Sequence, residues 1–156
     1  MTRAALVAMA FVVMEPVAYL LHRFVMHRFG MVWHASHHRP RLGTFERNDL
    51  FPVVLSALTV AAMLAGLVVG ALGWLLWTAI GVTAYGMAYL FVHDLYIHRR
   101  VPSFTWTCAP LERVREAHRI HHLFSGEPYG FLFPIVPTRL REQARTVDRD
   151  PLVNTA

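Results

Sequence analysis

The chain has 156 residues, of which 55% are hydrophobic and only 16% are charged, and its mean hydropathy is +0.38. This apolar fraction exceeds the roughly 45–50% of an average soluble domain, and the length suits one domain covering residues 1–156. The formal net charge of +5 comes from arginine without lysine, and no nucleic-acid motif accompanies it, so we expect contact with anionic lipid and no nucleic-acid partner. The single cysteine, Cys108, excludes an intrachain disulfide.

Three apolar runs approach the roughly 20 residues that a bilayer-crossing helix needs. They cover about residues 4–21, interrupted by Glu15-Pro16, then about residues 50–72 and about residues 74–92. The short segment Gly70-Ala71-Leu72-Gly73 predicts a tight connection, so the second and third runs form a helical hairpin. The pattern predicts an all-α integral membrane protein with about three to four transmembrane helices.

Arginine is distributed unevenly about these runs. Only Arg3 lies before the first run, whereas the loop between the first two runs and the segment after the third are rich in arginine (Arg39, Arg41 and Arg47; Arg99, Arg100, Arg113, Arg115, Arg119 and four more up to Arg149). Loops rich in arginine stay in the cytoplasm. We therefore expect a protein of the inner, cytoplasmic membrane whose first loop and last third are cytoplasmic.

All ten histidines fall in four short clusters at or just beyond the cytoplasmic ends of the runs. The clusters are His22 with His27, then His34, His37 and His38, then His93 with His98, and finally His118, His121 and His122. Neutral imidazole is the commonest metal ligand. Ten donors exceed what one ion accepts, so the clusters predict a cytoplasmic cap holding two metal ions.

The clusters form a loose internal repeat, in which a pair five residues apart precedes a trio, once in each half. On a helix the trio positions i, i+3 and i+4 share a face, so each trio can present nitrogens to one or two metals. Residues five apart are about 140° apart around an ideal helix. Each pair therefore either serves two different metals or converges where the helix end tightens or bulges. Imidazole suits zinc, copper, iron and nickel, so spacing alone does not choose the metal.

The segment after the third run predicts a helix over residues 111–123, with Pro110 near its start and Gly126, Pro128 and Gly130 ending it. Residues 129–137 are apolar and aromatic without helical charge spacing. They indicate either a loop at the membrane interface or a wall facing a substrate. The polar tail from Thr138 supports no prediction.

Four polar side chains are candidates to support the histidines. Glu15 lies seven residues before His22 on the same helix face, so it could accept a hydrogen bond from that ring; the alternative is a solvated kink at the following proline. Asn48 and Asp49 precede the second run and could either cap its helix or support the metal ligands. Asp94 follows a candidate ligand and could orient another histidine.

The chain resembles the bacterial β-carotene 3-hydroxylases of the fatty-acid hydroxylase and sterol desaturase superfamily. The resemblance covers about residues 14–137 and extends beyond the histidines. It is carried by Met14-Glu15 leading to His22 and His27, Trp33-His34-Ala35-Ser36-His37-His38-Arg39-Pro40, Phe45-Glu46-Arg47-Asn48-Asp49-Leu50, Thr83-Ala84-Tyr85-Gly86 leading to His93-Asp94, Ala117-His118-Arg119-Ile120-His121-His122, and Gly130-Phe131-Leu132.

This resemblance implies a membrane monooxygenase with two iron ions held by the ten histidines. It would use dioxygen and electrons from reduced ferredoxin to hydroxylate carbon 3 of each β-ionone ring, converting β-carotene to β-cryptoxanthin and then zeaxanthin. Its carotenoid substrate would come from the membrane lipid. Zinc could replace iron in purified samples.

Aromatic residues near the clusters are candidates for the substrate pocket, namely Tyr85, Tyr89, Phe131 and Phe133. Phe131 and Phe133 could wall a pocket for a ring, or anchor the chain at the membrane interface. Tyr89, like Tyr19, lies three or four residues before a histidine. Each tyrosine could hydrogen-bond below the metals or simply pack.

Two alternatives remain open at this stage. One is another polyhistidine membrane oxygenase, such as a lipid hydroxylase, a desaturase or a carotenoid ketolase, which pigment analysis would separate. The other is a metal-binding transporter or sensor without redox chemistry. Transporters place their ligands near the bilayer midplane, whereas these histidines lie at the membrane surface, which favours the oxygenase.

Overall fold

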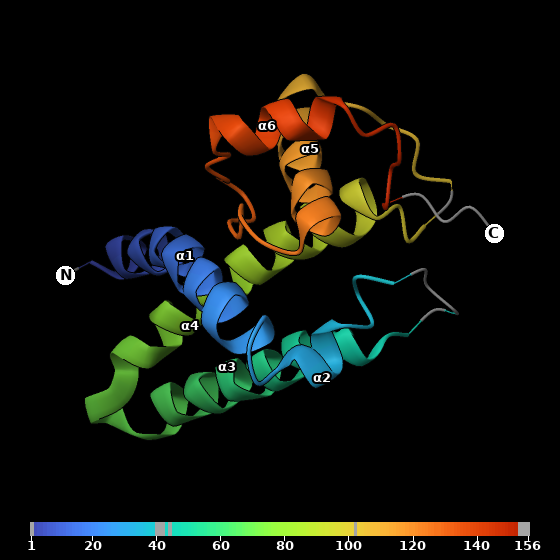
Figure 1. Ribbon diagram of the computed structural model, residues 1–156. Coiled ribbons are helices and arrows are strands. Elements are labelled where there is room, and N and C mark those ends of the chain that lie inside the picture. The colour runs from blue at the N-terminus through green and yellow to red at the C-terminus, as the bar shows by residue number, and fades with distance from the viewer. Residues whose placement is uncertain (1, 40–42, 44, 102, 153–156) are drawn as a thin grey trace.

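The computed structural model describes residues 2–39, 43, 45–101 and 103–152, and Pro40 and Arg41 lie outside these residues. The described residues form helices and no strand, which confirms the all-α prediction (Figure 1). The elements are α1 (Arg3–Leu20), η1 (Leu21–Met26), α2 (Met31–His34), η2 (Arg47–Asp49), α3 (Leu50–Val68), η3 (Gly70–Leu72), α4 (Gly73–Tyr89), η4 (Leu90–Ile97), α5 (Ala109–Phe124) and α6 (Thr138–Arg145). Here η1 and η4 are π-helices, and η2 and η3 are 3₁₀ turns.

Three helical units in the described residues are long and apolar enough to cross a membrane, namely Arg3–Met26, Arg47–Val68 and Gly70–Ile97. Their number and order match the prediction. Glu15-Pro16 interrupts the apolar run but not the helix, because α1 continues through Pro16. A membrane-crossing helix tolerates proline because neighbouring groups can satisfy the backbone that proline leaves unpaired.

The third unit lies at the centre of the spans, with α4 packed against both α1 and α3 (Figure 1). Glycine allows this close approach. A Cβ on Gly81 of α4 would lie 2.3 Å from the Val7 carbonyl oxygen of α1, and one on Gly66 of α3 would lie 2.5 Å from the Leu76 backbone nitrogen of α4. Small residues at such contacts are the usual way in which membrane helices pack.

The turn η3 joins α3 to α4, as predicted for the helical hairpin. The guanidinium of Arg3 lies 5.1 Å from the centre of the Trp77 ring, near the start of α4. The N-terminus therefore lies at the same end of the spans as this turn, and the histidine clusters lie at the opposite end.

Helices α5 and α6 form a cap beyond that opposite end (Figure 1). Pro110 lies in the first turn of α5, and Ser125 ends it in a left-handed conformation with φ of 51°, so the predicted helix over residues 111–123 is confirmed. Helix α6 is an element that the sequence did not predict. The C-terminal segment lies against α5, where Arg115 pairs with Asp150 at 2.5 Å and Arg119 donates to the Arg149 carbonyl oxygen at 2.9 Å.

Candidate metal centre

Both histidine pairs lie on π-helical turns. In η1 the His27 backbone N–H donates to the His22 carbonyl at 3.0 Å, and in η4 the His98 N–H donates to the His93 carbonyl at 3.0 Å. These hydrogen bonds span five residues, the pattern of a π-helix, whereas an α-helix spans four. The wider turn brings residues five apart onto one face, and the ring centres of the pairs are 5.0 and 4.6 Å apart. Of the two interpretations of the pairs, convergence at a bulged helix end is therefore correct.

The histidines gather into two adjacent groups. In each group one nitrogen per residue lies within 4.8 Å of all the others, and the groups are His22, His27, His34 and His121, and His37, His93, His98 and His118. The Nε2 atom of His38 is 3.2 Å from that of His34, so His38 joins the first group. The Nε2 atom of His122 is 2.9 Å from that of His118, so His122 joins the second. We call these groups of five site A and site B.

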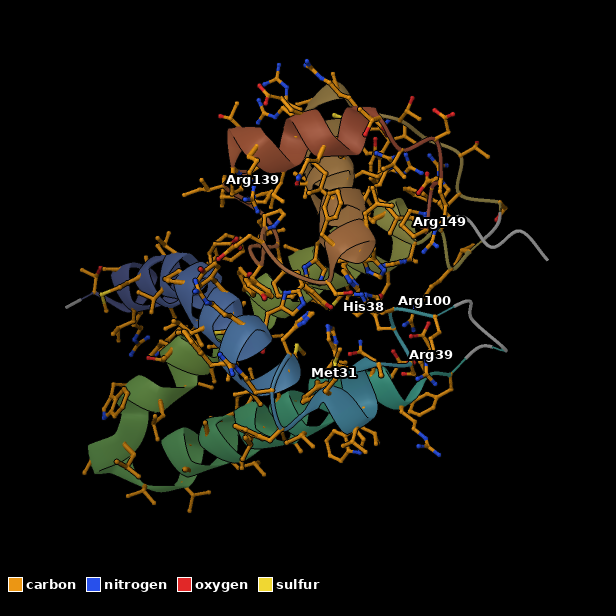
Figure 2. The ribbon with its side chains drawn as sticks, in the orientation of Figure 1. Met31, His38, Arg39, Arg100, Arg139 and Arg149 are labelled. Atoms are coloured by element: carbon orange, nitrogen blue, oxygen red, sulfur yellow. The ribbon has the colours of Figure 1, made fainter. Side chains whose placement is uncertain are left out.

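His38 and His122 lie where the two sites meet, and their rings stack with centres 4.4 Å apart. Figure 2 shows His38 near the middle of the molecule, between α5 and α2. The structure thus brings all ten predicted histidines together from the first loop, the ends of two spans and α5.

Four histidines direct their Nδ1 atoms at oxygen atoms that can only accept a hydrogen bond. His22 donates to the Tyr129 carbonyl (3.0 Å), His34 to the Asn48 amide oxygen (2.7 Å), His93 to the Asp94 carboxylate (2.8 Å) and His121 to the Gly126 carbonyl (2.6 Å). The proton of each neutral ring is therefore on Nδ1, and the lone pair is on Nε2.

These lone pairs converge. The Nε2 atom of His34 lies 3.2 Å from that of His22, 3.1 Å from that of His27 and 3.2 Å from that of His38. A nitrogen without a proton cannot satisfy three neighbours by hydrogen bonding. A separation of about 3 Å is instead what two imidazoles show when each binds one ion at about 2.1 Å and they meet at about a right angle. The donor set therefore fits metal ions.

Burial keeps these rings neutral. It lowers the pKa of His34 to about 3 and that of His38 to about 4. Burial, followed by repulsion from neighbouring imidazoles, also holds the pKa values of His37 and His118 well below the usual 6.5. Metal binding requires neutral imidazole, so the site holds its ligands in the required state at neutral pH.

Asn48 and Asp49 divide the two roles that the sequence left open. Asn48 is buried and supports His34, whereas Asp49 accepts from the Glu46 backbone N–H at 2.9 Å and pairs with Arg100 at 2.7 and 3.1 Å. Asp94 does orient a histidine, but it is the preceding residue, His93, and not another one. The contact of Arg100 with these carboxylates was not predicted, because its only signal in the sequence is its position just after a histidine pair.

Glu15 binds a loop and not the ligand predicted for it. Its carboxylate accepts hydrogen bonds from the backbone N–H groups of Phe131, Leu132 and Phe133 at 2.9–3.2 Å and from the Tyr85 hydroxyl at 2.7 Å. The predicted hydrogen bond from His22 is wrong, because His22 donates to Tyr129. The solvated kink is also wrong. Glu15 instead fixes the loop that carries the acceptor for His22.

Two aromatic rings lie directly against the histidines. Phe131 stacks on His22 with centres 4.8 Å apart, and Tyr89 stacks on His93 at 4.7 Å. These two rings contact each other edge to face at 4.8 Å. Phe131 and Tyr89 therefore form an apolar floor that touches both sites.

The other aromatic candidates lie elsewhere. Tyr85 packs on Phe11 and donates to Glu15, and the Phe133 side chain is 74% exposed. Within residues 129–137, Phe131 thus faces the histidines and Phe133 faces outward. Tyr19 does not hydrogen-bond below the metals, because its hydroxyl donates to Glu127 at 2.8 Å.

Comparison with known proteins adds a family to this geometry. Residues 7–139 match the family described as fatty acid hydroxylase. The chain is 38% identical to a "Beta-carotene hydroxylase" of Pseudescherichia vulneris, covering 90% of this chain and 82% of that protein, and 38% identical to one of Pantoea ananas, covering 91% and 83%. It is 41% identical to a "Beta-carotene 3-hydroxylase, chloroplastic" of an Oncidium hybrid cultivar, covering 75% and 40%. No solved structure matches the chain.

Proposed function

This chain belongs to the fatty acid hydroxylase family, and on that premise we propose that it is a membrane monooxygenase that hydroxylates carbon 3 of the β-ionone rings of β-carotene. The product is β-cryptoxanthin after one ring and zeaxanthin after both. One observation carries the proposal: two five-histidine sites lie at the end of the spans of a chain that resembles bacterial β-carotene hydroxylases over nine-tenths of its length. The choice of carbon 3 rests on the Oncidium relative, which is named as a β-carotene 3-hydroxylase.

The proposed occupants of sites A and B are two iron ions. Bound iron supplies the redox chemistry that activates dioxygen. The overall reaction consumes one dioxygen, two electrons and two protons for each C–H bond converted to C–OH, and releases one water. The all-imidazole donor set supports a redox metal that also binds dioxygen, although imidazole accepts zinc in a purified sample.

The electron donor in this proposal is reduced ferredoxin. Helix α6 packs on α5 in the cap and exposes Arg139, Arg141 and Arg145. A basic surface of this kind steers a negatively charged protein partner toward the cap.

The chain's own residues position the substrate. The apolar floor of Phe131 and Tyr89 gives a hydrocarbon ring a surface next to both sites and keeps water away from it. A polyene dissolved in the bilayer reaches this surface along the spans. Selectivity for one carbon then follows from placement, because a fixed oxidant attacks the C–H bond that is held nearest to it.

The three apolar spans support a location in the membrane. We propose that the metal sites face the cytoplasm. The support is the excess of arginine in the first loop and the cap. Reporter fusions after Ala71 should be active on the periplasmic side, and fusions after Asp150 in the cytoplasm. The opposite pattern would overturn the orientation.

The function is tested by expressing the chain in cells that make β-carotene, with iron supplied, and separating the pigments by chromatography. The expected product is zeaxanthin, with β-cryptoxanthin appearing when oxygen is limiting. A His121→Ala variant at the same expression level is the matched control. Echinenone or canthaxanthin would identify a ketolase. Unaltered β-carotene, with a ferredoxin system also supplied, would overturn the carotenoid substrate.

A further inference from the structure

The two metal sites have equal numbers of ligands from matching halves of the chain. Site A takes His22, His27, His34 and His38 from the first half and His121 from the second, whereas site B takes His93, His98, His118 and His122 from the second half and His37 from the first. The middle histidine of each trio crosses to the other site. The internal repeat of the sequence thus builds two sites with the same five imidazoles.

The groups that hold these imidazoles are not equal. In site A, His22 and His121 donate to backbone carbonyls and His34 donates to the Asn48 side-chain amide, so all three of these acceptors are uncharged. In site B, the Nδ1 atom of His93 donates to the carboxylate of Asp94 at 2.8 Å. A second carboxylate, that of Glu46, lies 3.6 Å from the Nδ1 atom of His37.

The difference is present at equivalent positions of the repeat. The residue after the first histidine of the pair is Arg23 in the first half and Asp94 in the second. Arg23 is exposed and directed away from the rings, where it pairs with Glu127 at 2.9 Å. Asp94 is buried beside its ring. Two otherwise matching modules therefore differ at this position by two units of charge.

Arg100 forms ion pairs with three carboxylates beside site B. Its guanidinium lies 3.4 Å from Asp94, 2.7 Å from Asp49 and 3.6 Å from Glu46. Three carboxylates and one guanidinium leave a net charge of −2 in this cluster. The guanidinium also fixes the positions of Asp94 and Glu46, so their negative charge is held next to the ligands of site B.

From this asymmetry we propose that the two metal positions differ in affinity, with site B binding a divalent cation more tightly than site A. Asp94 and Glu46 are the positioning residues responsible. A carboxylate that accepts from the outer nitrogen of an imidazole makes the ring a stronger donor, and changes to such partners alter metal affinity by about 10–100-fold. This inference rests on the metal centre of the proposed function, but not on its substrate.

The test is a titration of the full-length, metal-stripped protein in detergent with Co²⁺, followed by visible absorption. Two equivalents should bind, the first at least about tenfold more tightly than the second. Because the first cation repels the second, two steps would arise even in identical sites. The decisive result is therefore which of the two sites fills in each binding step. Equal affinity for both equivalents of Co²⁺ would overturn the proposal.

Asp94→Asn is the key variant, because the amide oxygen can still accept from His93 while the charge is lost. It should weaken the tighter equivalent by about 10–100-fold and leave the weaker one unchanged. The matched change at site A is Asn48→Asp, which puts a carboxylate on His34 and should tighten the weaker equivalent. Equal weakening of both steps by Asp94→Asn, or no effect of either variant, would overturn the proposal.

Ligand variants assign the steps independently. His98→Ala should remove the tighter step and His27→Ala the weaker one, and the reverse assignment would contradict the proposal. If either variant fails to fold, the two isosteric variants still decide the question. No carotenoid is present in these titrations, so their outcome is independent of whether the proposed hydroxylation is correct.

Discussion

Replacing Glu15 by glutamine tests whether one carboxylate inside the first span controls the geometry of the metal centre. Glu15 accepts from three consecutive backbone N–H groups and from the Tyr85 hydroxyl. Glutamine keeps the size and one acceptor oxygen, but it exchanges the other oxygen for an NH₂ group that cannot accept. A hydrogen bond to a charged group contributes about 1.5–3 kcal/mol. Loss of about 2 kcal/mol lowers the ratio of docked to undocked loop about thirtyfold.

The consequence should appear in turnover and not in metal content. The loop carries the Tyr129 carbonyl that orients His22 and the Phe131 ring that stacks on it. We expect Glu15→Gln to lower the rate of β-carotene hydroxylation by about tenfold or more while keeping about two metals per chain, because all ten histidines remain. The assay is zeaxanthin formation in isolated membranes, with metal measured by mass spectrometry on the purified protein.

A matched control separates the carboxylate from its tyrosine partner. Tyr85→Phe removes one of the hydrogen bonds to Glu15 and leaves the three from the loop, so its effect on turnover should be smaller than that of Glu15→Gln. Unchanged turnover in Glu15→Gln would refute the argument that this charge holds the loop. Loss of metal together with activity would show that Glu15 supports the ions themselves.

Three further predictions concern ligands, packing and pH. His37→Ala or His121→Ala should abolish hydroxylation in protein that stays in carbonate-washed membranes, and full activity would remove that residue from the centre. Gly81→Ala should lower the unfolding temperature in detergent, because overpacking costs about 1–3 kcal/mol, whereas Gly86→Ala, with nothing within 4 Å of its Cβ, should not. Burial lowers the pKa of His34 to about 3 and that of His38 to about 4, so acid should weaken Co²⁺ binding through these two ligands of site A only as the pH falls toward 4. Their protonation should cost less than about tenfold in affinity between pH 7.5 and 5.5, whereas each ligand of ordinary pKa 6.5 would cost about tenfold.

The spans and the histidine clusters were predictable because each depends on local sequence. Length and apolarity alone define a bilayer-crossing helix, and the three observed units overlap the three predicted runs. The five-residue spacing of His22 and His27 was also informative, since it is incompatible with side-by-side ligands on a regular helix. It left open whether the two rings of a pair bind different metals or converge where the helix bulges. The rings converge, because η1 and η4 are π-helical turns.

Asn48 and Asp94 were candidates from the sequence because their side chains are polar, whereas the carbonyls of Tyr129 and Gly126 that accept from His22 and His121 could not be predicted, because they are backbone groups. The Tyr129 carbonyl lies 107 residues from His22, and the N–H groups that Glu15 binds lie 116–118 residues away. Every residue offers the same carbonyl and N–H, so sequence carries no signal for which one is used. Helix α6 was not predicted because its segment has few apolar residues.

The crossing of the middle histidines follows from helix geometry. In α5, His118 and His122 are four residues apart and so differ by about 40° around the helix, whereas His121 lies about 60° to the other side of His118. One ion can take the close pair, and the third ring must point to a neighbouring ion. Since His37 of the first trio does the same in the opposite direction, neither half of the chain completes a site alone. Ions bound at the two sites would therefore link α5 and the first loop to the ends of the spans.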